Sequence, residues 1–124
     1  MEKEFFICNH CGNIITKLTD KKVPVFCCGE KMNQLQAGTI EASAEKHIPV
    51  CVVEDRIALI NIGSIEHPMT NEHYIEWVVI HTNKGEHFAH LSPQDKPFVK
   101  FALIEDETVS NVFAYCNLHG LWKA

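Results

Sequence analysis

Residues 73–91, HYIEWVVIHTNKGEHFAHL, contain two stretches of strand-forming residues separated by a turn sequence. The first stretch alternates well enough for one long strand and is rich in β-branched and aromatic residues. The tetrapeptide NKGE that follows places Asn83 and Gly85 where a tight turn between strands needs them. This part of the chain therefore predicts an antiparallel β-hairpin.

Similar short strands are predicted on both sides of the hairpin. PVCVV (49–53) and IALINIG (57–63) lie upstream, separated by the turn sequence EDR. FVKFALI (98–104) and VSNVFAY (109–115) lie downstream, with SPQDKP and EDET as breaks. Six or seven strands at near-regular spacing, without a long helical pattern or an internal repeat, predict an antiparallel β-sandwich.

The N-terminal region differs in composition from the rest of the chain. Residues 1–36 hold four of the six cysteines and few large apolar side chains after Phe5, Phe6 and Ile7. Such a stretch cannot bury enough surface to fold unaided, so a bound metal is expected to stabilise it. The segment LQAGTIEASAEKH (35–47) is typical of a connector. We expect two domains, residues 1–36 and 37–124.

Charge and cysteine usage restrict the class of protein. The formal charge is −5 and no basic stripe is present, which argues against general binding to nucleic-acid backbones. No apolar run approaches the roughly 20 residues that cross a bilayer, and the start MEKEFFICNH lacks the apolar core of a signal peptide. We therefore expect a cytoplasmic protein whose cysteines bind metal rather than form disulfides.

Four cysteines have the spacing of a metal site. Cys8 and Cys11 form a C-x-x-C knuckle followed by Gly12, whereas Cys27 and Cys28 are adjacent. Four thiolates suit Zn²⁺ or a single iron ion. Zinc ribbons usually have two C-x-x-C pairs, and an adjacent pair with Cα atoms about 3.8 Å apart should open one sulfur–metal–sulfur angle. Both metals remain possible on spacing alone.

A second group of candidate ligands combines imidazoles with a thiol. His67 precedes Pro68, and Pro49 restricts the loop that carries His47, so both histidines lie in stiffened backbone. The other candidates are His73 in NEHYI, and Cys116 and His119 in YCNLHGLWKA. Five further positions are expected to be ordinary surface or core residues: His10, Cys51, His81, His87 and His90.

Five motifs together identify a family resemblance. They are, in order along the chain, CNHCGN, FCCGEKM, AEKHIPV, GSIEHPMTNEHYIEW and YCNLHGLWKA. The chain resembles the desulfoferrodoxins, the two-iron superoxide reductases. The resemblance implies an all-β protein: a small desulforedoxin-like, metal-bound N-terminal domain followed by an antiparallel immunoglobulin-like β-sandwich. It also implies two sites, with one iron held by Cys8, Cys11, Cys27 and Cys28, and the other by His47, His67, His73 and His119 with Cys116 as axial ligand.

The resemblance further implies a reaction. The second iron, as Fe(II) with an open sixth position, would reduce superoxide to hydrogen peroxide by one electron without evolving oxygen. Because a net charge of −5 disfavours an anionic substrate, a local positive field is needed. By family likeness Lys46 attracts superoxide and orders a proton-donating water, while Glu45 occupies the sixth position in the oxidised enzyme. A rubredoxin-like electron donor and a homodimer are expected on the same ground.

Three other functions would use the same candidate metal ligands in different ways. A rubredoxin-like electron carrier would use the four-cysteine iron and leave the histidine site structural. A zinc-stapled binding module would be colourless and would not react with superoxide. A dismutase would evolve oxygen together with peroxide, whereas a reductase needs an external electron donor.

Overall fold

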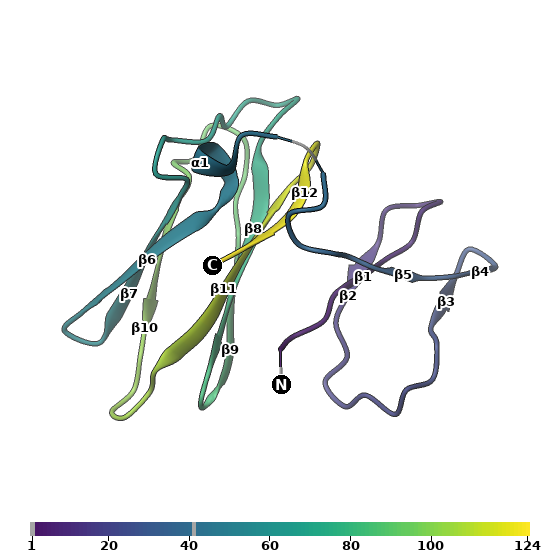
Figure 1. The fold of residues 1–124 in the computed structure, drawn as a ribbon, viewed down its shortest axis with the longest axis horizontal. Coiled ribbons are helices and arrows are strands. Elements are labelled where there is room, and N and C mark those ends of the chain that lie inside the picture. The colour runs from purple at the N-terminus through teal and green to yellow at the C-terminus, as the bar shows by residue number, and fades with distance from the viewer. Residues whose placement is uncertain (1, 41) are drawn as a thin grey trace. The chain divides into compact units, whose positions relative to one another are not determined.

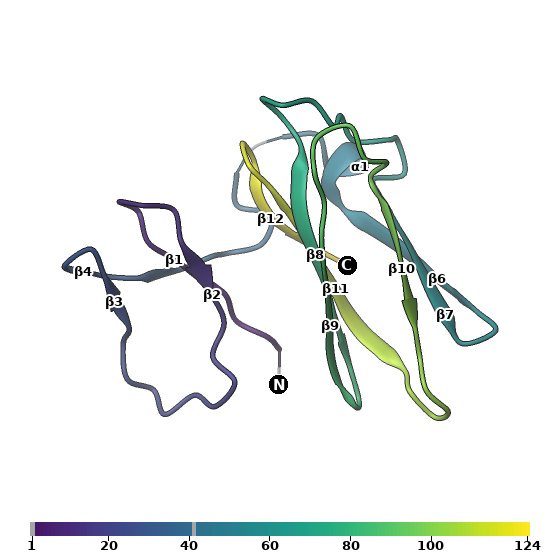
Figure 2. The same ribbon diagram turned by 180° about the vertical axis from the view of Figure 1, so that it is seen from behind.

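A computed structural model describes residues 2–40 and 42–124. The chain divides into two compact units, residues 1–36 and 37–124 (Figures 1 and 2). Both are built from β-strands, and the one short helix of the described residues lies in the second unit. The all-β prediction is therefore confirmed. Within the described part of the chain, no helix has the length and apolarity needed to span a membrane.

The first unit is held together by very short strands. β1 (Phe6–Ile7) pairs with β2 (Ile14–Ile15) and β5 (Asn33–Gln34), and β3 (Phe26–Cys27) pairs with β4 (Glu30–Lys31). Few apolar side chains are buried. Phe5 and Met32 are 4% exposed, but Leu18 is 94% and Phe26 64% exposed. This unit therefore depends on something other than an apolar core for its stability.

The second unit is a β-sandwich of seven strands, as the spacing of strand-forming stretches predicts. One sheet has the order β10-β7-β6 and the other β12-β11-β8-β9, and all neighbours are antiparallel. β12 has too few residues and no apolar alternation, so the sequence did not predict it. The elements are α1 (Ala44–His47), β6 (Pro49–Glu54), β7 (Ile57–Ile62), β8 (Ile75–Thr82), β9 (Gly85–His90), β10 (Phe98–Ala102), β11 (Val109–Cys116) and β12 (Gly120–Lys123).

The core lies between the two sheets. Successive side chains of a strand point to opposite faces, so every second residue of β7 is buried: Ala58, Ile60 and Ile62 are at most 1% exposed. They belong to one apolar cluster with Val78 and Ile80 of β8, which are fully buried. The alternation in the sequence is thus the direct cause of the layered packing.

Loops distant in sequence gather at one end of the sandwich. In Figures 1 and 2, α1, the loop from β7 to β8 and the turn from β11 to β12 lie at the same end. The β6–β7 and β8–β9 turns and the β10–β11 loop lie at the other. Candidate ligands from three parts of the chain are therefore brought to a common end.

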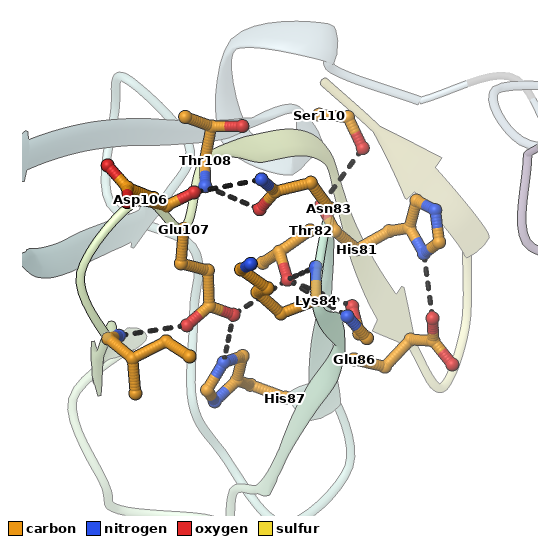
Figure 3. Close-up of polar contacts among 12 residues, drawn as sticks. His81, Thr82, Asn83, Lys84, Glu86, His87, Asp106, Glu107, Thr108 and Ser110 are labelled. Atoms are coloured by element: carbon orange, nitrogen blue, oxygen red, sulfur yellow. Dashed lines mark hydrogen bonds and ion pairs between the residues drawn. The ribbon is translucent and has the colours of Figure 1, made fainter.

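A buried carboxylate closes the opposite end of the sandwich (Figure 3). The Glu107 side chain, only 3% exposed, accepts hydrogen bonds from Thr82 Oγ1 at 2.6 Å and from the Ile104 N–H at 3.0 Å. His87 Nε2 lies 2.8 Å from the same carboxylate. The Thr82 hydroxyl, the Ile104 N–H and His87 together lower the pKa of Glu107 to about 2. Glu107 thus ties the β10–β11 loop to the β8–β9 hairpin.

Replacement of Glu107 by Gln should remove a stabilisation that depends on pH. The folded pKa of about 2 lies below the ordinary value of about 4.3, so the ionised carboxylate stabilises the fold above that ordinary value. The contribution is lost as the pH falls toward 2. The urea midpoints of wild type and Glu107→Gln should therefore differ near pH 7 and converge in acid. Glu105→Gln, at an exposed position of the same loop, is the control, and a pH-independent difference for Glu107→Gln would contradict the prediction.

Candidate metal centres

Four sulfur atoms converge in the first unit, and we call Cys8, Cys11, Cys27 and Cys28 the cysteine site. Their sulfurs all lie within 4.8 Å of one another. The Cys11 and Cys27 sulfurs are 3.6 Å apart, and those of the adjacent pair 4.0 Å. Cys8 is buried and Cys11 and Cys28 are exposed, so the site lies at the surface of its unit. The sequence spacing thus brings four potential thiolate ligands together.

Two local backbone features make this convergence possible. Cys28 has φ +54°, a left-handed conformation that is uncommon outside glycine and turns both adjacent sulfurs toward one point. At the knuckle, Gly12 has φ +86° and its N–H donates to the Cys8 carbonyl at 2.9 Å. The Cys11 N–H then points at the Cys8 sulfur, 3.5 Å away, and the Asn13 N–H at the Cys11 sulfur, 3.4 Å away. Such N–H groups stabilise thiolates.

The pKa values of two thiols of the cysteine site are shifted in opposite directions. Bonding from the backbone N–H of Cys11 lowers the pKa of Cys8 to about 6. Contact with the Cys11 side chain raises the pKa of Cys28 to about 12. Four thiolates at these separations repel one another, and a metal ion removes that repulsion. The donor set therefore fits a tetrahedral metal.

A second cluster lies at the end of the sandwich where α1 and two loops meet, and we call its five residues the histidine site. They are His47 at the end of α1, His67 and His73 in the loop from β7 to β8, Cys116 at the end of β11, and His119 in the turn before β12. One ligand atom from each of His47, His67, His73 and Cys116 lies within 4.8 Å of the other three. His119 joins them, with Nδ1 3.1 Å from His47 Nε2.

The four imidazole rings form a square. Neighbouring rings are nearly perpendicular, with centroids 4.5 to 5.0 Å apart and interplanar angles of 79° to 87°. His47 and His73, on opposite corners, are 6.2 Å apart and inclined by 29°. Metal–nitrogen bonds of about 2.1 Å at right angles separate two nitrogens by about 3.0 Å. The observed 3.1 Å matches ligands at right angles around one ion.

Two carbonyl groups decide which nitrogens face the centre. His47 Nδ1 lies 2.7 Å from the Ser43 carbonyl, and His67 Nδ1 lies 2.7 Å from the Pro68 carbonyl. A carbonyl accepts only, so both Nδ1 atoms carry the proton and both Nε2 atoms present a lone pair. Those lone pairs face each other at 3.1 Å. Burial lowers the pKa of His67 to about 4 and also lowers that of His47, which keeps both rings neutral at pH 7.

The thiol of Cys116 completes the donor set. Cys116 is fully buried, and its sulfur lies 3.9 Å from His119 Nδ1. Burial raises the pKa of the Cys116 thiol, while the backbone N–H groups of Leu118 and His119 act in the opposite direction by bonding to sulfur. His73 Nε2 is likewise buried without a hydrogen-bond partner in the described structure. Facing lone pairs, an orphaned nitrogen and a buried thiol all fit a bound cation.

Glu45 and Lys46 are placed beside this site by a close backbone contact. Both side chains are exposed on α1, next to the buried His47. The Glu45 carbonyl accepts the Ile65 N–H at 2.9 Å, which fixes the helix against the loop from β7 to β8. The charge of Lys46 adds to burial in lowering the pKa of His47 and of His73. An anion near these rings would therefore feel the Lys46 charge.

Several residues that orient ligands were not singled out from the sequence. Trp122 stacks on His47, with centroids 4.9 Å apart, and its indole N–H donates to the His119 carbonyl at 3.0 Å. The carbonyl groups of Ser43 and Pro68 leave no trace in the sequence, since any residue has one. Other histidines take part elsewhere, as expected: His81 pairs with Glu86, and His10 is exposed.

Comparisons with known proteins agree on one family. The Desulfoferrodoxin family model matches residues 39–124. A desulfoferrodoxin from Syntrophotalea carbinolica is 40% identical over 98% of this chain and 94% of its own length. The crystal structure of the superoxide reductase from Treponema pallidum superposes with a TM-score of 0.85 at 36% identity, covering 100% of this chain and 99% of that one. A one-iron superoxide reductase from Giardia intestinalis covers 64% of this chain and 95% of its own, with a TM-score of 0.56 at 30% identity.

Replacement of Gly63 by Ala should destabilise the second unit more than a matched replacement. Gly63 has φ +82°, and a Cβ there would meet the Ile65 carbonyl and lie 2.6 Å from the Glu45 carbonyl. We expect a cost of about 1–2 kcal/mol for the left-handed backbone plus about 1–3 kcal/mol for displacing α1. Gly38→Ala, at φ +69° in open space, should lose only the part of the free energy of unfolding that comes from the left-handed backbone. Urea unfolding followed by the fluorescence of Trp77 and Trp122 measures both, and equal losses would contradict the close contact.

Proposed function

Because this chain belongs to the desulfoferrodoxin family and is a superoxide reductase, we propose that an iron ion bound at the histidine site carries out the reaction. The observation that carries the proposal is the donor set itself. Four imidazoles in a square and one thiol would supply five ligands, which would leave one position of an octahedral ion open for substrate. Zinc usually settles at four ligands, so this set favours iron.

A bound iron ion and the protein around it would have separate parts in the reaction. Iron(II) at this site supplies the one electron that, with two protons, converts superoxide to hydrogen peroxide. The protein's part is to keep His47 and His67 neutral through burial, while the bonds from their Nδ1–H groups to backbone carbonyls fix the tautomer that turns Nε2 toward the site. The Cys116 sulfur accepts bonds from two backbone N–H groups that favour its thiolate form, and as a ligand it would donate electron density to the iron.

Lys46 and Glu45 are proposed to act on the substrate side. The ammonium group of Lys46 attracts the superoxide anion and orders a water molecule that donates a proton. Its support is that Lys46 follows Glu45 on the exposed face of α1 and that its charge affects His47 and His73. The Glu45 carboxylate is proposed to take the open position in the oxidised protein. The carbonyl contacts of Glu45 keep the backbone of both residues in place.

We also propose an iron ion at the cysteine site and three features of the protein's context. The exposed Cys11 and Cys28 support electron entry from a rubredoxin-like donor, since a thiolate-bound iron near the surface can exchange electrons with a partner. The six unbridged cysteines suit a reducing, cytoplasmic location. A homodimer is proposed as well, because the first unit has little apolar core of its own.

Metal analysis tests the two sites together. Protein prepared with iron available and oxygen excluded should hold two irons per chain, and His119→Ala should lose the iron of the histidine site alone. His90→Ala, a histidine outside the site, is the matched control and should keep both. Zinc at the cysteine site with iron at the other would retain the reaction but remove the first site as an electron relay. If the protein binds only zinc after iron reconstitution, the proposal that it holds iron is refuted.

Lys46→Ala should slow the reaction of the reduced protein with superoxide while both metals stay bound. Steering by all the charges of a site raises association rates by about 10- to 1000-fold at low ionic strength, so loss of this one charge should cost up to about tenfold in rate. The difference from wild type should shrink as salt is added, because salt screens the charge. Pulse radiolysis measures the rate, and product analysis should find peroxide without oxygen evolution. Lys84→Ala, an exposed lysine in the β8–β9 turn, serves as control, and an unchanged rate for Lys46→Ala would refute the electrostatic role.

A further inference from the structure

Asn117 lies between two residues of the histidine site, Cys116 and His119, and its side chain bonds to both neighbours of a third, His73. The Asn117 side-chain N–H donates to the Glu72 carbonyl at 2.9 Å. Its side-chain oxygen accepts the Tyr74 N–H, also at 2.9 Å. The backbone N–H of Asn117 donates to the Tyr74 carbonyl at 3.2 Å. One residue thus binds the chain immediately before and after His73.

This arrangement fixes the backbone of His73 from outside its own loop. A planar amide that bonds the residues on both sides of a third residue restricts the rotations of the backbone between them. Within the loop, Thr70 bonds directly to the backbone of His73. The Thr70 hydroxyl accepts the His73 N–H at 3.1 Å, and the Thr70 N–H donates to the His73 carbonyl at 2.9 Å. The backbone of His73 is therefore held on both sides.

His73 needs this support more than two of its neighbours do. The rings of His47 and His67 are oriented by direct bonds to carbonyl groups. In the described structure, His73 Nε2 is buried without any hydrogen-bond partner. The bonds that hold the backbone of His73 therefore help to place its ring.

The opposite end of the sandwich contains the same set of bonds in a place without metal ligands. Asn83 donates through its side chain to the Asp106 carbonyl at 2.8 Å and accepts the Thr108 N–H at 2.8 Å. Its backbone N–H donates to the Thr108 carbonyl at 3.2 Å. Figure 3 shows this amide bracketing Glu107 as Asn117 brackets His73. The two asparagines make equivalent bonds and differ in what lies between their partners.

We propose that Asn117 is a positioning residue that holds His73 in register with Cys116 and His119, and so sets the metal affinity and electronic structure of the histidine site. The proposal rests on the iron site proposed above. Partners that orient metal ligands without touching the metal typically contribute 10- to 100-fold to its affinity. The two side-chain bonds join residues 43 and 45 positions apart in sequence, so they couple the C-terminal ligand pair to the loop from β7 to β8.

The test compares Asn117→Ala with Asn83→Ala in the full-length, iron-loaded protein. Each variant loses two side-chain bonds to backbone, so both should lower the melting temperature by similar amounts. Asn117→Ala should in addition weaken iron binding at the histidine site by about 10-fold or more. It should also change the visible absorption, the electron paramagnetic resonance spectrum and the midpoint potential of that iron. The iron of the cysteine site, in the same molecule, should keep its affinity and spectrum in both variants.

Two outcomes would overturn the proposal. Asn117→Ala with wild-type affinity and spectrum at the histidine site would show that His73 is held without the amide. An equal change in Asn83→Ala would show that the site responds to general loss of stability. If Asn117→Ala does not fold, Asn117→Asp provides the same comparison, because it keeps the acceptor for Tyr74 and loses the donor to Glu72.

A measurement without metal separates this proposal from the proposed function. In metal-free protein the amide proton of Tyr74 should exchange with solvent faster in Asn117→Ala than in wild type. Unchanged exchange would refute the bond itself and leave the iron chemistry untouched. Failure of wild-type protein to bind iron at the histidine site would instead overturn the proposed function, whatever the Tyr74 exchange shows.

Discussion

Two nitrogen lone pairs that face each other at 3.1 Å are the constraint on which the second unit is organised. The carbonyl groups of Ser43 and Pro68 hold the protons of His47 and His67 on the far side of each ring, so the near sides cannot bond to one another. A cation between them turns this repulsion into attraction. The rest of the unit, from the strand ends to the loops, serves to bring such groups together and keep water away from them.

In the β-sandwich, most residues that stabilise the fold are different from those that form the histidine site. Its core lies between two sheets and uses apolar residues that alternate along each strand, and none of the histidines of the site is needed to form it. The histidines come from segments that leave the sheets at one end, whereas Cys116 is the last residue of β11 and belongs to the core as well. The first unit shows the reverse: its strands have two residues each and few of its apolar side chains are buried, so a metal ion held by its four cysteines would also be what stabilises it.

The sequence predicted those features that depend on local patterns. Alternating stretches predicted six of the seven strands of the sandwich, and cysteine spacing predicted the cysteine site. Local sequence settings offered the five residues of the histidine site as candidate ligands, and the family resemblance assigned all five to one iron. Contacts between distant segments escaped prediction: Gly63 matters because the Glu45 carbonyl packs against it, and Asn117 because of bonds to residues 72 and 74. A two-residue strand has no period to detect, which is why the strands of the first unit were missed.

The repeated asparagine arrangement shows how one structural solution serves two purposes. At one end, Asn83 brackets Glu107, whose carboxylate is satisfied entirely by protein donors, and the result is a closed loop. At the other, Asn117 brackets His73, whose Nε2 finds no donor or acceptor in the described protein. The pattern of bonds to the asparagine is the same, but of these two places only the second leaves a buried lone pair unsatisfied in the described protein. The buried lone pair of His73 Nε2 therefore distinguishes the candidate metal centre from the loop around Glu107, which has a purely structural role.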